Sequence, residues 1–181
     1  MIRWVLWLIG GLVLGGVVHL TTILMMPRIA TQDAYSRLSP VTPVNAFVPL
    51  PEPGADDPLV PFRDPAFAAS VCRFDLAGGP LKLQAPVTQA YTSMSFYTRV
   101  GVPFYSINDR AAGRRSIELD LMTAAQRSQL PEEEDVTAAD RLIVEAPMTA
   151  GLIVLRALAT EPSLMPTVRD ALTSARCGSQ Q

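Results

Sequence analysis

The sequence has few of the residue types on which enzyme active sites depend. It contains one histidine, His19, and one lysine, Lys82, among 181 residues. His19 lies within an apolar N-terminal run, and the rest of the chain has no histidine. The folded part of the chain therefore cannot form a Ser-His or Cys-His catalytic arrangement. The sequence also lacks a glycine-rich phosphate loop and a G-x-S-x-G elbow. These absences disfavour the common hydrolase and nucleotide-binding classes.

Cysteine is equally scarce, with Cys72 and Cys177 as the two examples. Their spacing fits no C-x-x-C redox or metal motif. With a single histidine in the chain, a zinc or haem site has too few ligands, and we expect no metal or cofactor. A structural disulfide between the two cysteines is the natural interpretation, and it would favour an oxidising compartment. Two unrelated buried thiols are the alternative.

Charge of one sign does not dominate the chain. The net charge of -2 gives no basic footprint for nucleic acid. Within the alternating run at residues 116–122, Glu118 and Asp120 face the same way. Paired carboxylates of this kind keep a carboxylate-dependent hydrolase open as a less favoured function. On an exposed strand face, however, such a pair is more often solvated.

The most informative positive feature is the run from Trp4 to Met26, which has no ionised side chain. As a helix it would span roughly 30 Å of hydrocarbon. We therefore predict a cytoplasmic tail over residues 1–3 and an uncleaved transmembrane helix over residues 4–26. The flanking charges are nearly balanced, but the short tail with Arg3 and the cysteines favour a domain in the periplasm, outside the bacterial inner membrane. A cleaved signal peptide is the alternative, although the run continues well past Gly15 and Gly16.

Small residues are spaced four apart within this helix. Gly11 and Gly15 form a G-x-x-x-G pair, and His19 lies one turn further along the same face. Such a face lets a second helix approach closely, so these three residues are the candidate helix–helix contact. Glycine is also simply common in membrane helices, which is the alternative explanation.

Residues 27–64 are predicted to form a short helix over 31–38 followed by a proline-rich extended segment, parts of which pack on the domain. Residues 65–181 are predicted to form a β-rich domain. Alternating apolar residues predict its strands, and a 3.6-residue period predicts a C-terminal helix over 162–176. The expected strands cover residues 67–76, 81–85, 90–99, 102–107, 116–122, 140–146 and 151–159.

Turn residues organise these strands. Gly78, Gly79 and Pro80 predict a hairpin between the first two strands, and Asn108 with Asp109 predicts a turn after the fourth. The predicted fold is a mainly-β (α+β) domain, an antiparallel β-sandwich or a barrel-like sheet with short helices and a C-terminal helix.

A polar turn followed by arginines is the candidate binding surface of this domain. Guanidinium groups beside an Asn-Asp turn suit a carboxylate, phosphate or acidic partner. A hairpin turn with an exposed or salt-bridged basic stretch is the alternative. The residues concerned are Tyr105, Asn108, Asp109, Arg110, Arg114 and Arg115.

Three stretches, at residues 17–38, 68–83 and 91–115, resemble a group of small membrane-anchored bacterial proteins whose soluble part is the domain of unknown function 1254. The strand-turn-strand run Tyr91–Arg115 is the most specific of the three. The resemblance implies a β-rich envelope protein and a partner, a second membrane protein that carries the domain of unknown function 1214. It implies no reaction and supplies no catalytic residues.

These observations favour a membrane-anchored envelope subunit that binds or assembles with a membrane partner. A periplasmic small-molecule or lipid-binding domain is the alternative, because the aromatic residues of the strands at 90–107 alternate in orientation and some of them are free to line a pocket. We do not expect an enzyme.

Overall fold

The computed structural model describes residues 1–29, 33–52, 59–60, 63–112, 116–129 and 142–179. Its contacts divide the chain into two compact units, Met1–Asp33 and Ala34–Gln181.

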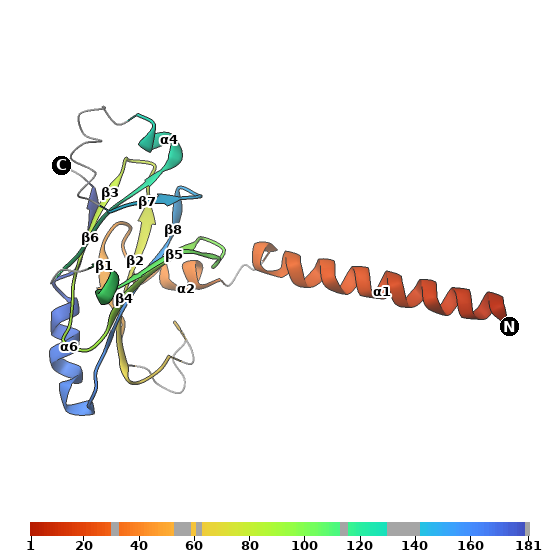
Figure 1. The fold of residues 1–181 in the computed structure, drawn as a ribbon, viewed down its shortest axis with the longest axis horizontal. Helices are drawn as coiled ribbons and strands as arrows, with labels where there is room; N and C mark the ends of the chain where they lie inside the picture. The colour runs from red at the N-terminus through yellow and green to blue at the C-terminus, as the bar shows by residue number, and fades with distance from the viewer. Residues whose placement is uncertain (30–32, 53–58, 61–62, 113–115, 130–141, 180–181) are drawn as a thin grey trace. The chain divides into compact units, whose positions relative to one another are not determined.

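The first unit consists of one long helix, α1 (Ile2–Ile29) (Figure 1). Its stretch Ile2–Met26 is long and apolar enough to cross a membrane, and none of its most apolar window is buried within the protein. The hydroxyls of Thr21 and Thr22 donate to the carbonyls of Val17 and Val18, at 2.8 Å and 2.9 Å. The polar side chains at this end of the helix are thereby satisfied within the helix, as an apolar environment requires.

The second unit contains two β-sheets. The five-stranded sheet has the order β1-β2-β8-β4-β5 and the four-stranded sheet the order β7-β6-β3-β9. All neighbours are antiparallel except β6 and β7, which are parallel. The sheets are open among the described residues, so the sandwich expectation is confirmed and the barrel is not formed. The strands are β1 (Phe47–Pro49), β2 (Phe67–Asp75), β3 (Leu81–Pro86), β4 (Thr92–Thr98), β5 (Pro103–Asn108), β6 (Ser116–Thr123), β7 (Leu142–Ala146), β8 (Ala150–Leu158) and β9 (Arg176–Ser179).

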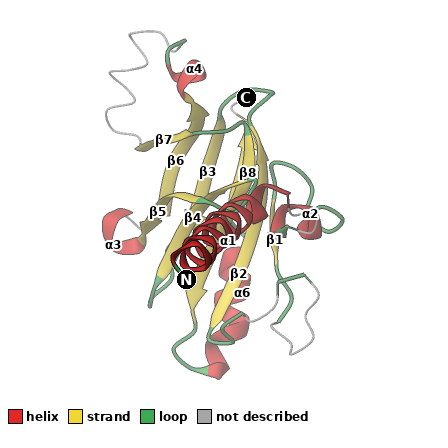
Figure 2. Cartoon of the chain, turned by 90° about the vertical axis from the view of Figure 1, so that its right-hand side faces the viewer, coloured by secondary structure: helices red, strands yellow, loops and turns green. Residues whose placement is uncertain are grey.

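Short helices connect or flank the strands and are red in Figure 2. The expected C-terminal helix is present but shorter, because its beginning is a 3₁₀ turn in which Leu164 is exposed rather than packed. The helices are α2 (Ala34–Leu38), α3 (Asp109–Ala112), α4 (Ala124–Arg127), the 3₁₀ turn η1 (Pro162–Leu164) and α6 (Met165–Leu172).

Both sheets contribute to one hydrophobic core. From the five-stranded sheet, Phe74, Phe96 and Ile153 are fully buried, and from the four-stranded sheet Leu83 and Ile117 are. Alternate residues of each strand point into this core, which is why the period-two pattern of the sequence located the strands.

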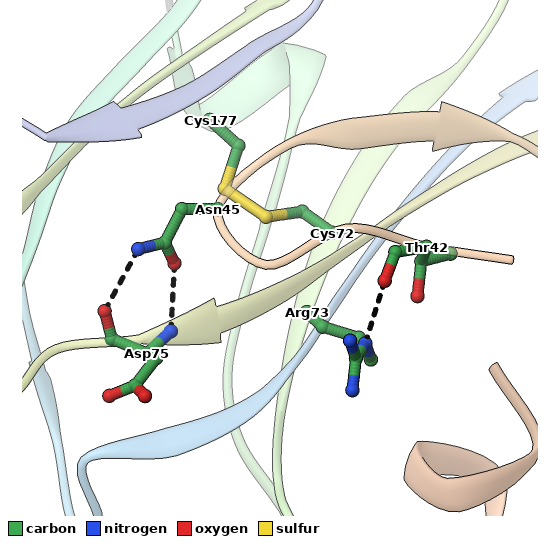
Figure 3. Close-up of a disulfide and its surroundings, with 6 residues drawn as sticks. All are labelled: Thr42, Asn45, Cys72, Arg73, Asp75 and Cys177. Carbon is green, nitrogen blue, oxygen red and sulfur yellow. Dashed lines mark hydrogen bonds between the residues drawn. A yellow bond between two sulfur atoms is a disulfide. The ribbon is translucent and has the colours of Figure 1, made fainter. Parts of the chain in front are cut away.

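A disulfide joins the two sheets at the core. Cys72 of β2 is bonded to Cys177 of β9 across a sequence separation of 105 (Figure 3). The disulfide that the sequence predicted is therefore present. A hydrophobic N-terminal helix of the signal or anchor kind, together with a disulfide, indicates an extracytoplasmic location for the domain.

The segment before β2 is fixed to this strand. Asn45, at a left-handed φ of 58°, donates from Nδ2 to the carbonyl of Asp75 at 3.0 Å and accepts from its N–H at 2.8 Å. Arg73 donates from Nε to the carbonyl of Thr42 at 3.0 Å (Figure 3). Asparagine tolerates the left-handed conformation, so Asn45 allows the chain to bend and pair with β2.

One predicted hairpin is wrong, and a short helix replaces the simple turn predicted at Asn108 and Asp109. β2 and β3 do not form a hairpin, because β2 pairs with β8 and β3 with β6. The Gly78–Pro80 turn, with Gly79 at φ 127°, instead passes the chain from one sheet to the other. Asn108 ends β5 and Asp109 begins α3, because the Asn108 side chain accepts the N–H of Ala111 at 3.0 Å and caps this helix.

Candidate functional site

A groove of about 560 Å³ lies between the beginning of α6 and the edge of the five-stranded sheet. We call it the α6 groove. Four alanines, which we call its floor, line it: Ala66 just before β2, Ala68 and Ala69 in β2, and Ala159 just after β8. Met165 and Arg169 of α6 form one wall, and Leu50 to Glu52, which follow β1, line it as well.

Backbone hydrogen bonds hold this floor and wall in place. Ala159 donates to the carbonyl of Ala66, and Leu50 donates to the carbonyl of Ala69, each at 2.9 Å. Phe67, which also lines the groove, packs edge-on against Tyr91 with ring centroids 6.4 Å apart. The groove is therefore preformed, as ligand sites usually are.

Among the residues that the structure describes, the charged ones that line the groove are Arg63, Arg169 and Glu52. Arg169 donates from Nη1 to Oε1 of Glu52 at 2.6 Å and from Nη2 to the carbonyl of Leu50 at 3.2 Å. The Arg63 Nε–H donates to the carbonyl of Val60 at 3.3 Å. An arginine-containing groove with largely apolar walls is chemically suited to an anionic group attached to an apolar body.

The surface predicted from the Asn-Asp turn is only partly described. Tyr105 packs against Phe96, with ring centroids 5.7 Å apart, and so contributes to the core. Asn108 caps α3, and Arg110 on that helix is exposed. One carboxylate oxygen of Asp109 is buried without a hydrogen-bond partner. Arg114 and Arg115 lie outside the described residues, so the predicted arginine cluster is not described as a whole.

The two carboxylates of β6 lie in different environments. Glu118 is exposed and accepts hydrogen bonds from Ser116 Oγ at 2.8 Å and from Gln84 Nε2 at 3.3 Å. Asp120 is only 5% exposed, so the expectation that both are solvated is wrong for Asp120. No group of three His, Cys, Asp or Glu residues suited to a metal ion occurs in the described part of the chain.

On α1, Gly11, Gly15 and His19 are all exposed. A Cβ atom added at Gly11 or Gly15 would meet no other atom within 4 Å. Their spacing of four residues places the three side chains on one helix face. A contact between this face and a second helix stays a prediction.

Sequence reasoning did not find the α6 groove. Glu52 and Arg169 are 117 residues apart in sequence, and neither occurs in a motif. The alanines of the groove floor look like ordinary small strand residues in the sequence. Only the pairing of β2 with β8 and the position of α6 bring these residues together.

Comparison with known proteins places most of the folded unit in one family. The model of the family described as a protein of unknown function, DUF1254, matches residues 44–178. No curated protein matches the chain.

One solved structure has a similar fold, and a second one matches more weakly. The VPA0106 protein from Vibrio parahaemolyticus is 12% identical with a TM-score of 0.58, and the match covers 81% of this chain and 34% of that one. An uncharacterised protein from Burkholderia cenocepacia is 15% identical with a TM-score of 0.48, over 70% of this chain and 34% of that one. The chain thus spans about a third of the length of these solved structures.

Proposed function

The chain belongs to the DUF1254 family, and from this premise we propose that it is a membrane-anchored envelope subunit that assembles with a second membrane protein. In this proposal α1 stays attached as an anchor in the inner membrane, with the N-terminus in the cytoplasm and the β domain in the periplasm. The partner is a membrane protein with an apolar helix, and a protein that carries the domain of unknown function 1214 is the first candidate.

The observation that carries the proposal is the face of α1 formed by Gly11, Gly15 and His19. In a lipid environment helices associate through close packing of small residues, because lipid chains are as apolar as leucine. A lone imidazole in such a helix favours a hydrogen-bonding partner, which a second helix supplies. Both arguments predict a contact on the same face.

The α6 groove favours a second candidate function, the binding of a small molecule or lipid in the periplasm. The specific observation is a preformed groove of about 560 Å³ that combines apolar walls with arginine. The two functions are compatible, because the groove and the α1 face are on different units of the chain.

The test is purification of the full-length protein in mild detergent with mass spectrometry of the proteins that accompany it. We expect a stoichiometric membrane protein, and we expect the double variant Gly11→Ile, Gly15→Ile to lose most of it. β-Branched side chains at these positions would keep the helices apart. The β domain should keep its fold in the full-length variant, which circular dichroism checks.

The matched control is the double variant Gly10→Ile, Gly16→Ile, with the same change in composition. At about 100° per residue these two glycines lie well away from the centre of the face formed by residues 11, 15 and 19. The control should retain the partner. Purification of the protein alone, or equal loss of the partner in both variants, would contradict assembly through this face.

A further inference from the structure

The α6 groove already contains a bound carboxylate, supplied by the protein itself. Glu52 places Oε1 2.6 Å from Nη1 of Arg169. The Glu52 side chain is 74% exposed and that of Arg169 is 30% exposed. Ion pairs this exposed contribute little to stability, so the Glu52 carboxylate is readily exchanged for another.

Arg169 would remain in position during such an exchange. Its second nitrogen, Nη2, donates to the carbonyl of Leu50 at 3.2 Å, and this carbonyl belongs to a residue whose own N–H is bonded to β2. The guanidinium therefore has one fixed contact to the backbone and one replaceable contact to a carboxylate. A planar fork of N–H donors suits a carboxylate especially well.

The remainder of the groove suits an aliphatic chain. Leu50, Phe67, Met165 and Pro166 line it, together with the alanines of the floor. Its volume of about 560 Å³ is within the range of sites that hold small ligands. A hydrocarbon chain placed there would remove apolar surface from water on both sides.

We propose that the α6 groove binds an aliphatic carboxylate, with its carboxylate on Arg169 in place of Glu52 and its chain along the alanine floor. In this arrangement Glu52 acts as an internal competitor that occupies Arg169 when no ligand is bound. The proposal rests on the second candidate function above and does not depend on assembly through α1.

Isothermal titration of the full-length protein in lipid nanodiscs, with octanoate as the probe, tests this. Empty nanodiscs supply the correction for partition of octanoate into lipid. Octanamide, which has the same chain without the charge, is the second probe. We expect octanoate to bind about tenfold more tightly than octanamide, because a charged hydrogen bond is stronger than a neutral one.

Two variants of the pair should change the affinity for octanoate in opposite directions. Glu52→Gln removes the competing carboxylate and should raise the affinity about threefold. Arg169→Gln removes the guanidinium that would bind the carboxylate of octanoate. It should therefore lower the affinity for octanoate to that for octanamide. A structural role alone would not produce these opposite shifts. The matched control is Arg176→Gln, because Arg176 contacts only the carbonyls of Thr173 and Ala175 and does not line the groove.

The outcomes separate the two claims. Equal binding of octanoate and octanamide would overturn the carboxylate proposal but keep ligand binding in the groove. Binding of neither probe would overturn both. If Arg169→Gln fails to fold by circular dichroism, Glu52→Gln decides, and an unchanged affinity for octanoate in that variant overturns the proposal.

Discussion

The two faces of the five-stranded sheet are covered in different ways. On the inner face Phe74, Phe96 and Ile153 are fully buried against the other sheet. On the outer face a smaller apolar cluster forms around Val71 and Leu152, and the short helix α2 covers it with Leu38. The inner face is thus closed by a whole sheet, and this part of the outer face by a helix of five residues.

Two cation–π contacts add to the apolar packing of the short helix α2. The ring of Tyr35 has the guanidinium carbon of Arg73 at 5.1 Å and that of Arg99 at 5.2 Å from its centroid. Each contact of this kind contributes about 0.5–1 kcal/mol when it is partly exposed. The comparison indicates that buried apolar area stabilises the inner face, whereas a few specific contacts stabilise α2 on the outer face. Substitutions at the inner face should therefore lower the free energy of unfolding by more than substitutions at α2.

The largest effect should come from the disulfide that joins the inner face to the second sheet. The double variant Cys72→Ala, Cys177→Ala opens a loop of 105 residues and should lower the free energy of unfolding by about 4 kcal/mol in the loop-entropy account. Urea unfolding of the full-length protein in nanodiscs, followed by circular dichroism, measures it. Wild-type protein treated with a reductant should show a similar loss, and full stability in both would contradict this account.

The next effect should come from Gly151, the glycine of β8 that faces Phe74. An added Cβ would lie 2.2 Å from the carbonyl oxygen of Tyr97 and 2.6 Å from the ring of Phe74. Because a backbone atom must move, Gly151→Ala should lower the free energy of unfolding by about 3 kcal/mol in the same urea measurement. Gly78→Ala, where nothing lies within 4 Å, is the control and should change it little.

A smaller effect is expected on the outer face. Tyr35→Ala removes the ring between the two arginines and should lower the free energy of unfolding by about 1–2 kcal/mol. Tyr35→Phe keeps the ring face and should be close to wild type. Hydrogen exchange of the α2 amides should rise in Tyr35→Ala alone. If Tyr35→Ala lowered the free energy of unfolding as much as Gly151→Ala does, the distinction between the two faces would be wrong.

The smallest expected effect is an increase in the free energy of unfolding. Ser70 is fully buried in β2, and its hydroxyl has no hydrogen-bond partner in the described structure. Ser70→Ala removes an unsatisfied group and should raise the free energy of unfolding by about 1 kcal/mol.

Thr92 provides the contrast, because its buried hydroxyl bonds to the N–H and the hydroxyl of Thr88, each at 2.9 Å. Thr92→Val should lower the free energy of unfolding by about 1 kcal/mol, since it leaves the Thr88 N–H without its partner. Urea unfolding of the pair checks both signs. A loss in Ser70→Ala would show that this hydroxyl is satisfied after all.

The sequence predicted well which strand residues face the core, and poorly what covers the opposite face of a sheet. Alternation in β6 placed Ile117, Leu119 and Leu121 on one buried face, and all three are buried. The same alternation predicted a solvated Asp120, which is buried, because sequence periodicity shows which residues share a face but not what covers that face.

Long-range pairing explains the remaining errors. The Gly78–Pro80 turn reads as a hairpin, yet β3 finds its partners in β6 and in β9, the strand after the last helix, which the sequence did not predict. The strand β9 is four residues long and too short for a period to be recognised. The groove between α6 and β2 depends on another long-range pairing, that of β2 with β8, so no local pattern predicted it.

The central claim is that the chain keeps α1 as an anchor and holds an oxidised domain outside the cytoplasm. The direct measurement is the intact mass of the protein from membrane and soluble fractions of cells, with free thiols alkylated before lysis. The account predicts the full-length mass, in the membrane fraction, with Cys72 and Cys177 unmodified because they are bonded. A shorter chain cleaved near Gly15 or Gly16 in the soluble fraction, or two alkylated cysteines, would contradict it.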